Sequence, residues 1–440
     1  MNIIPSSKNL ARYQEIITVL ARHGFGWLAA ELKLRGLLPL TQRLNGTGVV
    51  ESSVQATHLR LAFEELGTTF IKLGQVLSTR ADLLSPEYIA ELAKLQDATP
   101  SVPYEQIVAV FEAELEASPE DIFAAFDPAP IASASIGQVH AARLPGGEDV
   151  VVKIQRPGAA ALVDRDLDIL LDLAGLIAEH TGFGRDYDVL GLAQEFAFNL
   201  RCELNYIREG QNADRFRQAF ANDPDLHIPQ VYWDYTTERV IVLERLKGIK
   251  VNDLAALETA AIDRQQIAAN SVRLMLEEMF VHGFFHADPH PGNLYVLADG
   301  RIGMMDFGMV GRLDEKLQES LTRLFLALSK GDSERMIDEL ITSGIAQGQF
   351  NRKTLKQDLD HMIACYANSS VEDLAAARIF NELTGLARWH HLQLPNDLVL
   401  MAKVMAISEG LGLQLDPDFQ FIPFAQPYLE RYWLQRHSPW

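Results

Sequence analysis

The stretch His286–Asn293, with the sequence HADPHPGN, decides the predicted fold together with the Asp-Phe-Gly triplet at Asp306–Gly308. Two prolines and a glycine disfavour a regular helix, so the first stretch is predicted to be a fixed loop. A helix is predicted before it, at Ile267–His282. Two short strands, Leu294–Leu297 and Arg301–Met305, are predicted between the motifs, with a turn at Asp-Gly. Both motifs are therefore expected on loops that flank one small hairpin.

Three polar side chains of this region have the types and order that phosphoryl transfer requires. The reaction needs one carboxylate near the attacking oxygen, and an Asn and an Asp that hold the metal ions neutralising the phosphates. Asp288 is predicted to be the catalytic carboxylate, and Asn293 and Asp306 the metal ligands. ATP and Mg²⁺ are the cofactors that this chemistry implies. The triplet alone is a weak signal, and the combined set is a strong one.

Two other interpretations of the loop stay open. His286, Asp288 and His290 alternate along it, and alternate residues of an extended loop can converge on a metal ion. The loop could also be a purely structural polar turn. Neither alternative explains Asn293 and Asp306, which favours phosphoryl transfer. His286 itself is expected to anchor the loop by hydrogen bonds rather than to react.

A lysine upstream is the predicted phosphate contact. Lys153 lies in Glu148–Gln155, which a Pro-Gly-Gly turn joins to Gln138–Leu144 in a predicted hairpin. An inward lysine there is costly unless it pairs with phosphate or carboxylate. Glu203 is predicted to be its acidic partner and catalytic helper, and Glu209 is the second candidate. An exposed strand lysine is the alternative.

The segment before the hairpin, Ala132–Val139 or ASASIGQV, stands where a loop covering the nucleotide phosphates is expected. Small residues let backbone amides approach phosphate, and hydroxyl and amide side chains add donors. The residues predicted to bind the nucleotide are Ala132, Ser133, Ala134, Ser135, Ile136, Gly137, Gln138, Val139, Lys153, Glu244 and Leu246.

The wider pattern predicts an α+β chain with a protein-kinase-like, two-lobed fold. Three parts are expected: a helical N-terminal extension (1–115), an N-lobe (116–250) and a mostly helical C-lobe (251–440). The helices expected first cover 8–40, 56–77 and 86–97; the segment 8–40 could also lie on a membrane surface, although core packing is favoured. Further helices are expected at Val163–His180 and Leu192–Phe220, and a strand pair at Val231–Tyr235 and Arg239–Leu243.

The amino-acid composition limits the kinds of partner and the compartment that can be expected. Lys and Arg total 39 against 59 Asp and Glu, a net charge of −20, which argues against nucleic-acid binding. The two cysteines, Cys202 and Cys365, indicate a reducing compartment. No secretory signal and no membrane-spanning segment are predicted. A cytoplasmic protein is expected, with peripheral contact at the inner face of a membrane left open. The sequence leaves the oligomeric state undetermined.

A further motif, Lys72-Leu73-Gly74-Gln75, has no role in a standard kinase lobe, and by itself it suggests a solvated helical face. Together with the alanine-rich loop, Asp288–Asn293 and Asp306–Gly308, it resembles the UbiB/AarF family of atypical kinases, which is associated with ubiquinone biosynthesis. The resemblance covers roughly residues 60–312.

The resemblance implies that the helices bearing Lys72, Gly74 and Gln75 fold over the cleft and occlude a peptide-substrate site. It also implies that the alanine-rich loop disfavours ordinary protein phosphorylation. The implied activity is ATPase-like and supports quinone or lipid metabolism, with a lipid or quinone precursor as the implied ligand. One departure concerns the family's Glu-x-Asp motif, which here reads Glu203-Leu204-Asn205 and would weaken a link between Lys72 and an Asp.

An ATP-dependent UbiB-like phosphotransferase or ATPase is thus the leading expectation. A small-molecule phosphotransferase of the aminoglycoside or choline kinase type is the first alternative, because such enzymes also use a His-x-Asp-x-His-x-x-Asn loop. A non-catalytic, nucleotide-gated scaffold is the second alternative. The alanine-rich loop and Lys72–Gln75 count against the first alternative, and the complete set of metal and phosphate residues counts against the second.

Overall fold

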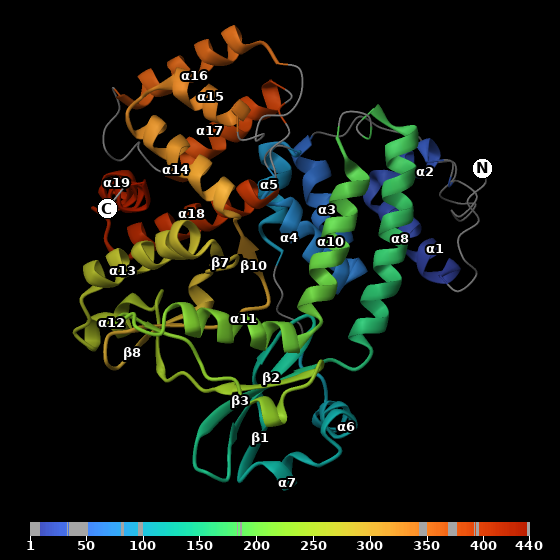
Figure 1. Ribbon diagram of the computed structural model, residues 1–440. Helices are drawn as coiled ribbons and strands as arrows, with labels where there is room; N and C mark the ends of the chain where they lie inside the picture. The colour runs from blue at the N-terminus through green and yellow to red at the C-terminus, as the bar shows by residue number, and fades with distance from the viewer. Residues whose placement is uncertain are drawn as a thin grey trace. The chain divides into compact units, whose positions relative to one another are not determined.

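The computed structural model groups the described residues into two compact units (Figure 1). The first unit comprises the described residues up to Arg80, those from Leu84 to Arg208, and Val231–Glu244. The second comprises Leu83, Glu209–Gln230 and the described residues from Arg245 onward. Helices and antiparallel strands occur together, which confirms the α+β class. The structure describes residues 9–32, 34, 52–80, 83–95, 100–182, 184, 187–342, 350–367, 376–390, 392 and 396–437.

The N-terminal part of the first unit is helical, as predicted. The segment predicted as 56–77 is divided at Gly67, whose φ of 93° no helix accommodates. Of the helix predicted over 8–40, residues 8, 33 and 35–40 lie outside the described residues. The elements are α1 (Leu10–Leu20), η1 (Ala21–Phe25), α2 (Gly26–Glu31), α3 (Ser52–Leu66), α4 (Thr68–Leu77), α5 (Pro86–Leu92), α6 (Tyr104–Leu115) and α7 (Pro119–Ile122).

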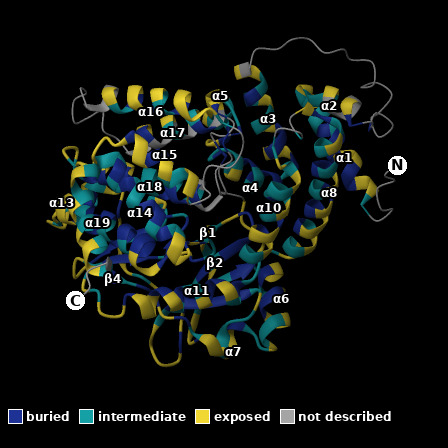
Figure 2. Cartoon of the chain, turned by 45° about the horizontal axis from the view of Figure 1, so that its top comes forward, coloured by how far each residue is buried: buried dark blue, intermediate teal, exposed yellow. Residues whose placement is uncertain are grey.

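A four-stranded antiparallel sheet follows, in the order β1 (Ala125–Ser133), β2 (Gly137–Arg143), β3 (Asp149–Gln155) and β5 (Val240–Glu244). The predicted hairpin is confirmed as β2 and β3, which are buried along most of their length (Figure 2). The edge strand β1 was not predicted, because its two prolines are tolerated only where one edge needs no donor.

The predicted strand Val231–Tyr235 is wrong. Val231 makes one isolated bridge with Leu243, and Trp233–Tyr235 forms the 3₁₀ turn η3. The Thr236 hydroxyl accepts a hydrogen bond from the Val242 backbone N–H at 3.2 Å, and the Tyr232 N–H donates to the Val242 carbonyl oxygen at 2.9 Å, so the segment contacts β5 without forming a strand.

Three helices follow β3 in the chain: α8 (Ala159–His180) and α10 (Val189–Glu203) in the first unit, and α11 (Tyr206–Ala219), most of which belongs to the second. α8 and α10 lie side by side (Figure 1). The single helix predicted over Leu192–Phe220 is therefore wrong. It breaks at Asn205, whose side-chain oxygen and backbone carbonyl both accept from the N–H of Arg208, at 3.4 and 3.0 Å. Asn205 thus begins α11 in the manner of a helix N-cap.

A buried ion pair fastens α1 to α8. Arg12 Nε lies 2.8 Å from Asp166 Oδ1, and Nη2 lies 2.9 Å from Oδ2 and 2.7 Å from the carbonyl oxygen of Leu66. Asp166 is only 1% exposed. A fork-to-fork guanidinium–carboxylate pair is directional. It fixes the N-terminal helices, including α4 beyond Leu66, against α8.

The second unit holds two small sheets and a helical majority, as predicted for this part of the chain. β4 (Leu226–His227), β9 (Ile302–Met304), β8 (Leu294–Leu297) and β6 (Gly248–Lys250) are neighbours in that order; β10 (Val310–Arg312) pairs with β7 (Phe284–His286). The hairpin predicted between the two motifs is confirmed as β8 and β9. The helices are α12 (Leu254–Thr259), α13 (Arg264–Leu276), η4 (Glu277–His282), η5 (Pro291–Asn293), α14 (Glu315–Ser329), α15 (Ser333–Thr342), α16 (Arg352–Ala367), α17 (Ala376–Trp389), α18 (Asn396–Leu415) and α19 (Phe421–His437).

A shared apolar core joins these helices to the loops between them. Phe285 and Ala287 are fully buried in it, together with Phe280 from η4, Leu321 from α14 and Val404 from α18. Burial of each large apolar side chain stabilises by roughly 1.5–3 kcal/mol. The loop that follows β7 is therefore seated on the helical core. No helix of the described segments is both long and apolar enough to span a bilayer.

Candidate functional site

In the second unit, His286 anchors the predicted catalytic loop. The ring is fully buried, its Nε2 lies 2.9 Å from the carbonyl oxygen of Met305, and the Asp288 backbone N–H donates to its Nδ1 at 3.1 Å. Burial lowers the pKa of His286, so the imidazole is neutral and donates from Nε2. The ring thus ties the backbone of Asp288 to the residue before Asp306, which confirms the anchoring role.

Asn293 closes the loop onto itself. Its Nδ2 donates to the carbonyl oxygen of Asp288 at 3.1 Å, and its own carbonyl oxygen accepts from the Met305 N–H at 2.9 Å. His290 caps the 3₁₀ turn η5, because its Nδ1 accepts from the Gly292 N–H at 3.1 Å. The amide nitrogen of Asn293 is thereby committed to the loop. Its oxygen is the atom that the side chain can offer to a cation.

Asp306 is held in a left-handed backbone conformation, with φ of 61°. Such a conformation costs a non-glycine residue of the order of 1–3 kcal/mol and persists where the surroundings determine it. Here they do, because Phe307 is 1% exposed and packs on Phe216 and His286, with ring centroids 5.1 and 5.5 Å apart. Asn212 Nδ2 also donates to the carbonyl oxygen of Phe307 at 3.0 Å. The Asp306 side chain is exposed at the end of this fixed segment.

The donor set fits a hard cation. Asn293 and Asp306 supply oxygens, and Mg²⁺ is bound through one or two carboxylates together with waters and phosphate oxygens rather than by an all-protein cage. Among the described residues no three His, Cys, Asp or Glu side chains gather as a metal-binding group. The alternative metal cluster of His286, Asp288 and His290 therefore has no support: both nitrogens of His286 are engaged, and His290 Nδ1 caps η5.

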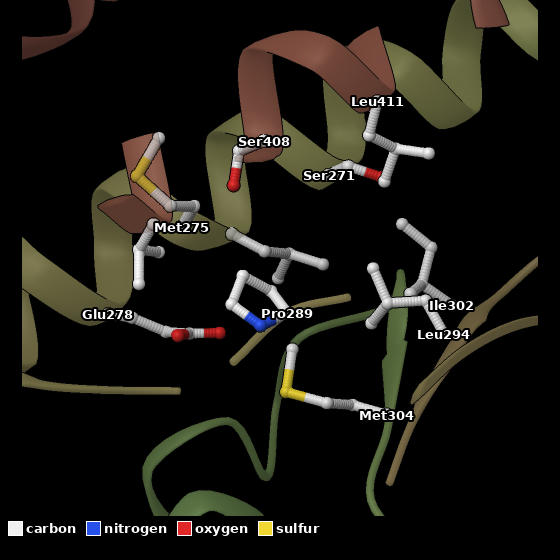
Figure 3. A pocket seen from close by; sticks show the side chains of 11 residues that line it. Ser271, Met275, Glu278, Pro289, Leu294, Ile302, Met304, Ser408 and Leu411 are labelled. Carbon is white, nitrogen blue, oxygen red and sulfur yellow. The ribbon is translucent and has the colours of Figure 1, made fainter. Parts of the chain in front are cut away.

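Beneath the loop lies a buried carboxyl group that the sequence did not single out (Figure 3). Glu278 is 2% exposed, and its Oε2 accepts from the His286 N–H at 2.9 Å. Ser271, Ser408 and Pro289 line the same cavity of about 20 Å³, which has room for one water molecule. Burial raises the pKa of Glu278 to about 8. Its helical position carries no sequence signal for this, because burial depends on α18, far along the chain.

In the first unit, Arg156 clamps the alanine-rich loop. Its Nε donates to the carbonyl oxygen of Ala134 at 2.7 Å, and its Nη2 to Ser133 Oγ at 2.8 Å and to the carbonyl oxygen of Pro100 at 2.7 Å. Its backbone N–H donates to the carbonyl oxygen of Ile136 at 2.8 Å. Sequence reasoning missed this residue. The guanidinium thus binds the loop through the Ala134 carbonyl and the Ser133 hydroxyl, and ties it to Pro100.

Gln138 requires a correction. It was predicted to offer its side chain to phosphate, yet it is 1% exposed and its amide clamps the backbone of Val102, with Oε1 2.8 Å from N and Nε2 3.3 Å from O. The reason is that Gln138 lies in β2 with its side chain turned toward Val102 and His140. Gly137 is required by packing: an added Cβ would lie 2.3 Å from Tyr206 Oη. The other residues predicted in this loop stay predictions.

Lys72, and not Lys153, is the lysine found at Glu203. Lys72 Nζ lies 2.6 Å from Glu203 Oε1, which the predicted partnership of Glu203 with Lys153 did not anticipate. Lys153 Nζ lies 5.0 Å from the ring centroid of Tyr206 in a cation–π arrangement. Glu209, in the first turn of α11, is 3% exposed. Glu209 belongs to the second unit, and its pairing with Lys153 stays a prediction.

The Lys-x-Gly-Gln motif is structural and is not a solvated face. Gly74 permits close packing, because a Cβ there would lie 2.2 Å from Leu95 Cδ1. Gln75 Nε2 donates to the carbonyl oxygen of Leu95 at 3.3 Å, while Lys72 reaches Glu203 on α10. The link from Lys72 to the rest of this unit therefore exists although Asn205 replaces the acidic residue.

Glu244 and Leu246 were predicted to complete the nucleotide site. Glu244 ends β5, opposite Val150 of β3. Leu246 packs near Gly303, where an added Cβ would lie 2.9 Å from Leu246 Cδ1. Both side chains are partly exposed. Their contact with nucleotide stays a prediction.

Comparison with known proteins identifies the family. Residues 94–340 match the model of the ABC1 atypical kinase-like domain, and residues 359–420 match the UbiB helical domain. The chain belongs to the ABC1/UbiB family of atypical kinases. This membership confirms the family resemblance and implies nucleotide binding.

Curated relatives agree with the family assignment. The chain is 36% identical to a protein named probable protein kinase UbiB from Marinobacter nauticus, over 87% of this chain and 70% of that protein. It is 35% identical to Activity of bc1 complex kinase 7, chloroplastic, from Arabidopsis thaliana, over 98% of this chain and 63% of that protein. An uncharacterized Synechocystis protein is 37% identical, with 85% and 64% covered. The chain thus spans less than two thirds of these last two relatives.

A solved structure supports the fold. The structure of Rv3197 with erythromycin, from Mycobacterium tuberculosis, matches with a TM-score of 0.59 at 24% identity, covering 84% of this chain and 94% of that one. At this identity the match bears on the fold alone. It agrees with the kinase-like architecture predicted from the motif order.

The raised pKa of Glu278 predicts a pH-dependent stability. Its pKa of about 8 in the folded chain exceeds the ordinary value near 4.3, so the folded state keeps a proton that the unfolded state loses between these values. This contribution is complete below about pH 4 and is lost as the pH rises through about 8, by at most about 1.4 kcal/mol per pH unit. Urea unfolding from pH 4.5 to 9 is expected to show a flatter profile for Glu278→Gln.

The matched control is Glu258→Gln, at an exposed position on α12. This variant is expected to keep the wild-type pH profile. Equal profiles for wild type and Glu278→Gln would show that Glu278 does not hold a proton in the folded chain.

Proposed function

We propose that the chain is a UbiB-like atypical kinase that binds MgATP and transfers or hydrolyses the terminal phosphoryl group. The observation that carries the proposal is the His286 ring, which joins the backbone of Asp288 to Met305, the residue before Asp306. In the proposed roles, Asp288 receives the proton of the attacking group, and Asn293 and Asp306 hold Mg²⁺. The metal would neutralise charge on the phosphates when bound.

The proposed nucleotide contacts in the first unit are Lys153 and the alanine-rich loop. Lys153 is proposed to meet the phosphates, with Glu209 as its acidic partner now that Glu203 is engaged by Lys72. In the loop, the backbone of Ala132–Gly137 is proposed to approach the phosphates. The guanidinium of Arg156 supports this, because it binds the carbonyl oxygen of Ala134 and so leaves one acceptor fewer to repel phosphate.

The proposed acceptor is water or a lipid-like small molecule, and not a peptide. Support comes from α4, where Lys72, Gly74 and Gln75 all make packing or polar contacts that hold the motif in place. We propose that these helices exclude peptides, as the family resemblance implies. We further propose that the activity supports quinone or lipid metabolism.

Replacement of Asp306 by Asn tests the enzyme proposal. Asn tolerates the left-handed conformation at this position but removes a charged metal ligand. Turnover of MgATP is expected to fall by about 10²-fold or more, and nucleotide binding is expected to lose most of its Mg²⁺ dependence. Isothermal calorimetry and phosphate release measure the two effects. The control is Asp299→Asn, in the exposed turn between β8 and β9, which is expected to keep wild-type turnover. Unchanged turnover in Asp306→Asn would refute the assignment.

A double-mutant cycle distinguishes the two acidic candidates. If Lys153 acts with Glu209, the effects of Lys153→Met and Glu209→Gln on the free energy of MgATP binding are coupled, within a range of about 0.5–3 kcal/mol. Lys153→Met and Glu203→Gln are expected to add within about 0.5 kcal/mol, because Glu203 serves Lys72. Calorimetry on the single and double variants gives both couplings, and the reverse pattern would restore Glu203 as the partner.

Metabolite profiling tests the pathway. Cells that lack the protein are expected to show altered quinone or lipid pools, restored by the wild-type gene and not by one encoding Asp306→Asn. A profile that is unchanged by the deletion would separate the chain from quinone and lipid metabolism. That result would not bear on whether the protein turns over MgATP.

A further inference from the structure

A lysine from the C-terminal helices reaches the predicted catalytic carboxylate. Lys403 Nζ, on α18, lies 3.1 Å from Asp288 Oδ1. Both residues belong to the second unit. Lys403 lies within the match to the UbiB helical domain, whereas Asp288 lies within the match to the kinase-like domain. No motif in the sequence connects the two positions.

The buried neighbours of Lys403 in the chain fix the position of its backbone on α18. Ala402 and Val404 are each 1% exposed, and α18 packs along α13. Val404 and Ser408 line the small cavity below the loop together with Pro289, the residue after Asp288 (Figure 3). The helix α18 therefore packs beneath the loop that carries Asp288. The contact follows from buried packing and not from a mobile surface side chain.

The exposure of the two partners suits a functional pair. The side chain of Lys403 is 25% exposed and that of Asp288 is 42% exposed. Pairs between fully exposed groups contribute little, and buried ones carry a large desolvation cost. A partly exposed pair avoids most of this desolvation cost, and its polar atoms stay accessible to an incoming ligand.

The loop itself lacks the cation that its chemistry calls for. His286–Asn293 contains no Lys or Arg. Both ring nitrogens of His286 are engaged by backbone groups of Met305 and Asp288, and His290 Nδ1 is engaged by the Gly292 N–H. Phosphoryl transfer depends on positive groups placed where charge gathers on the transferring oxygens. Lys403 brings an ammonium group with three donors to this place.

We propose that Lys403 is a positioning residue of the phosphoryl-transfer reaction: it holds Asp288 by Oδ1 and donates a second hydrogen bond to an oxygen of the transferring phosphoryl group. The inference rests on the proposed function. In the step, the acceptor oxygen forms a bond to the terminal phosphorus while the bond from that phosphorus to the bridging oxygen breaks. ADP leaves with the electron pair, and the proton of the acceptor goes to Asp288 Oδ2. The pair thus assigns one carboxylate oxygen to orientation and the other to the proton.

The test compares three variants of the full chain in steady-state MgATP turnover. Lys403→Met keeps the aliphatic stem and removes the charge, and kcat is expected to fall by about 10²-fold while KM for MgATP stays within about twofold. Lys403→Arg is expected to recover most of kcat. Lys316→Met, at an exposed position on α14, is the matched control and is expected to behave as wild type.

The outcomes separate this inference from the proposed function. Wild-type kcat in Lys403→Met, or a higher kcat, overturns the positioning role, provided that Asp306→Asn abolishes turnover. Equal losses in Lys403→Met and Lys403→Arg with a lowered Tm in both also overturn it, because a purely structural pair predicts that pattern. A wild-type chain that neither binds nor turns over MgATP refutes the proposed function, and the role of Lys403 falls with it.

Discussion

The candidate site depends on one buried imidazole. His286 is the last residue of β7, and its two ring nitrogens bind the backbone of Asp288 on one side and that of Met305 on the other. Because the ring is excluded from water, it stays neutral and keeps one donor and one acceptor. A protonated ring would repel the Asp288 N–H. The neutral, buried ring therefore sets the spacing between the loop and the segment of Asp306, which is proposed to bind the metal.

Three different physical means control the carboxylates that the two units use. Glu278 is buried and its pKa is raised to about 8. Asp288 is paired with Lys403, and Glu203 with Lys72. Asp306 is exposed on a strained backbone, held by the packing of Phe307. The chain has a net charge of −20, so many acidic groups are present. Burial, ion pairing and backbone packing decide which of them holds a proton, which is oriented and which is exposed to solvent.

The family motifs acquire distinct physical roles in the structure. In Lys72–Gln75, the lysine makes an ion pair, the glycine admits Leu95, and the glutamine binds the carbonyl of Leu95. In the alanine-rich loop, the Arg156 guanidinium binds the Ala134 carbonyl and the Ser133 hydroxyl. Asn205 retains a capping role at the start of α11, so its replacement of an acidic residue preserves the local turn. These contacts explain the motifs as packing and polarity requirements within their own unit.

The sequence by itself determined the features that short stretches encode. Prolines and glycine in His286–Asn293 specify a loop, β-forming runs joined by Pro-Gly-Gly specify the β2–β3 hairpin, and motif order specifies the kinase-like fold, because each depends on residue type and order along the chain. Only the tertiary structure decided the partners. Lys403 meets Asp288 from 115 residues away, Glu203 meets Lys72 from α4, and Gln138 faces Val102, since packing between distant elements sets where a side chain points. The proton on Glu278 belongs with these, because its pKa depends on water excluded by helices that no local pattern brings together.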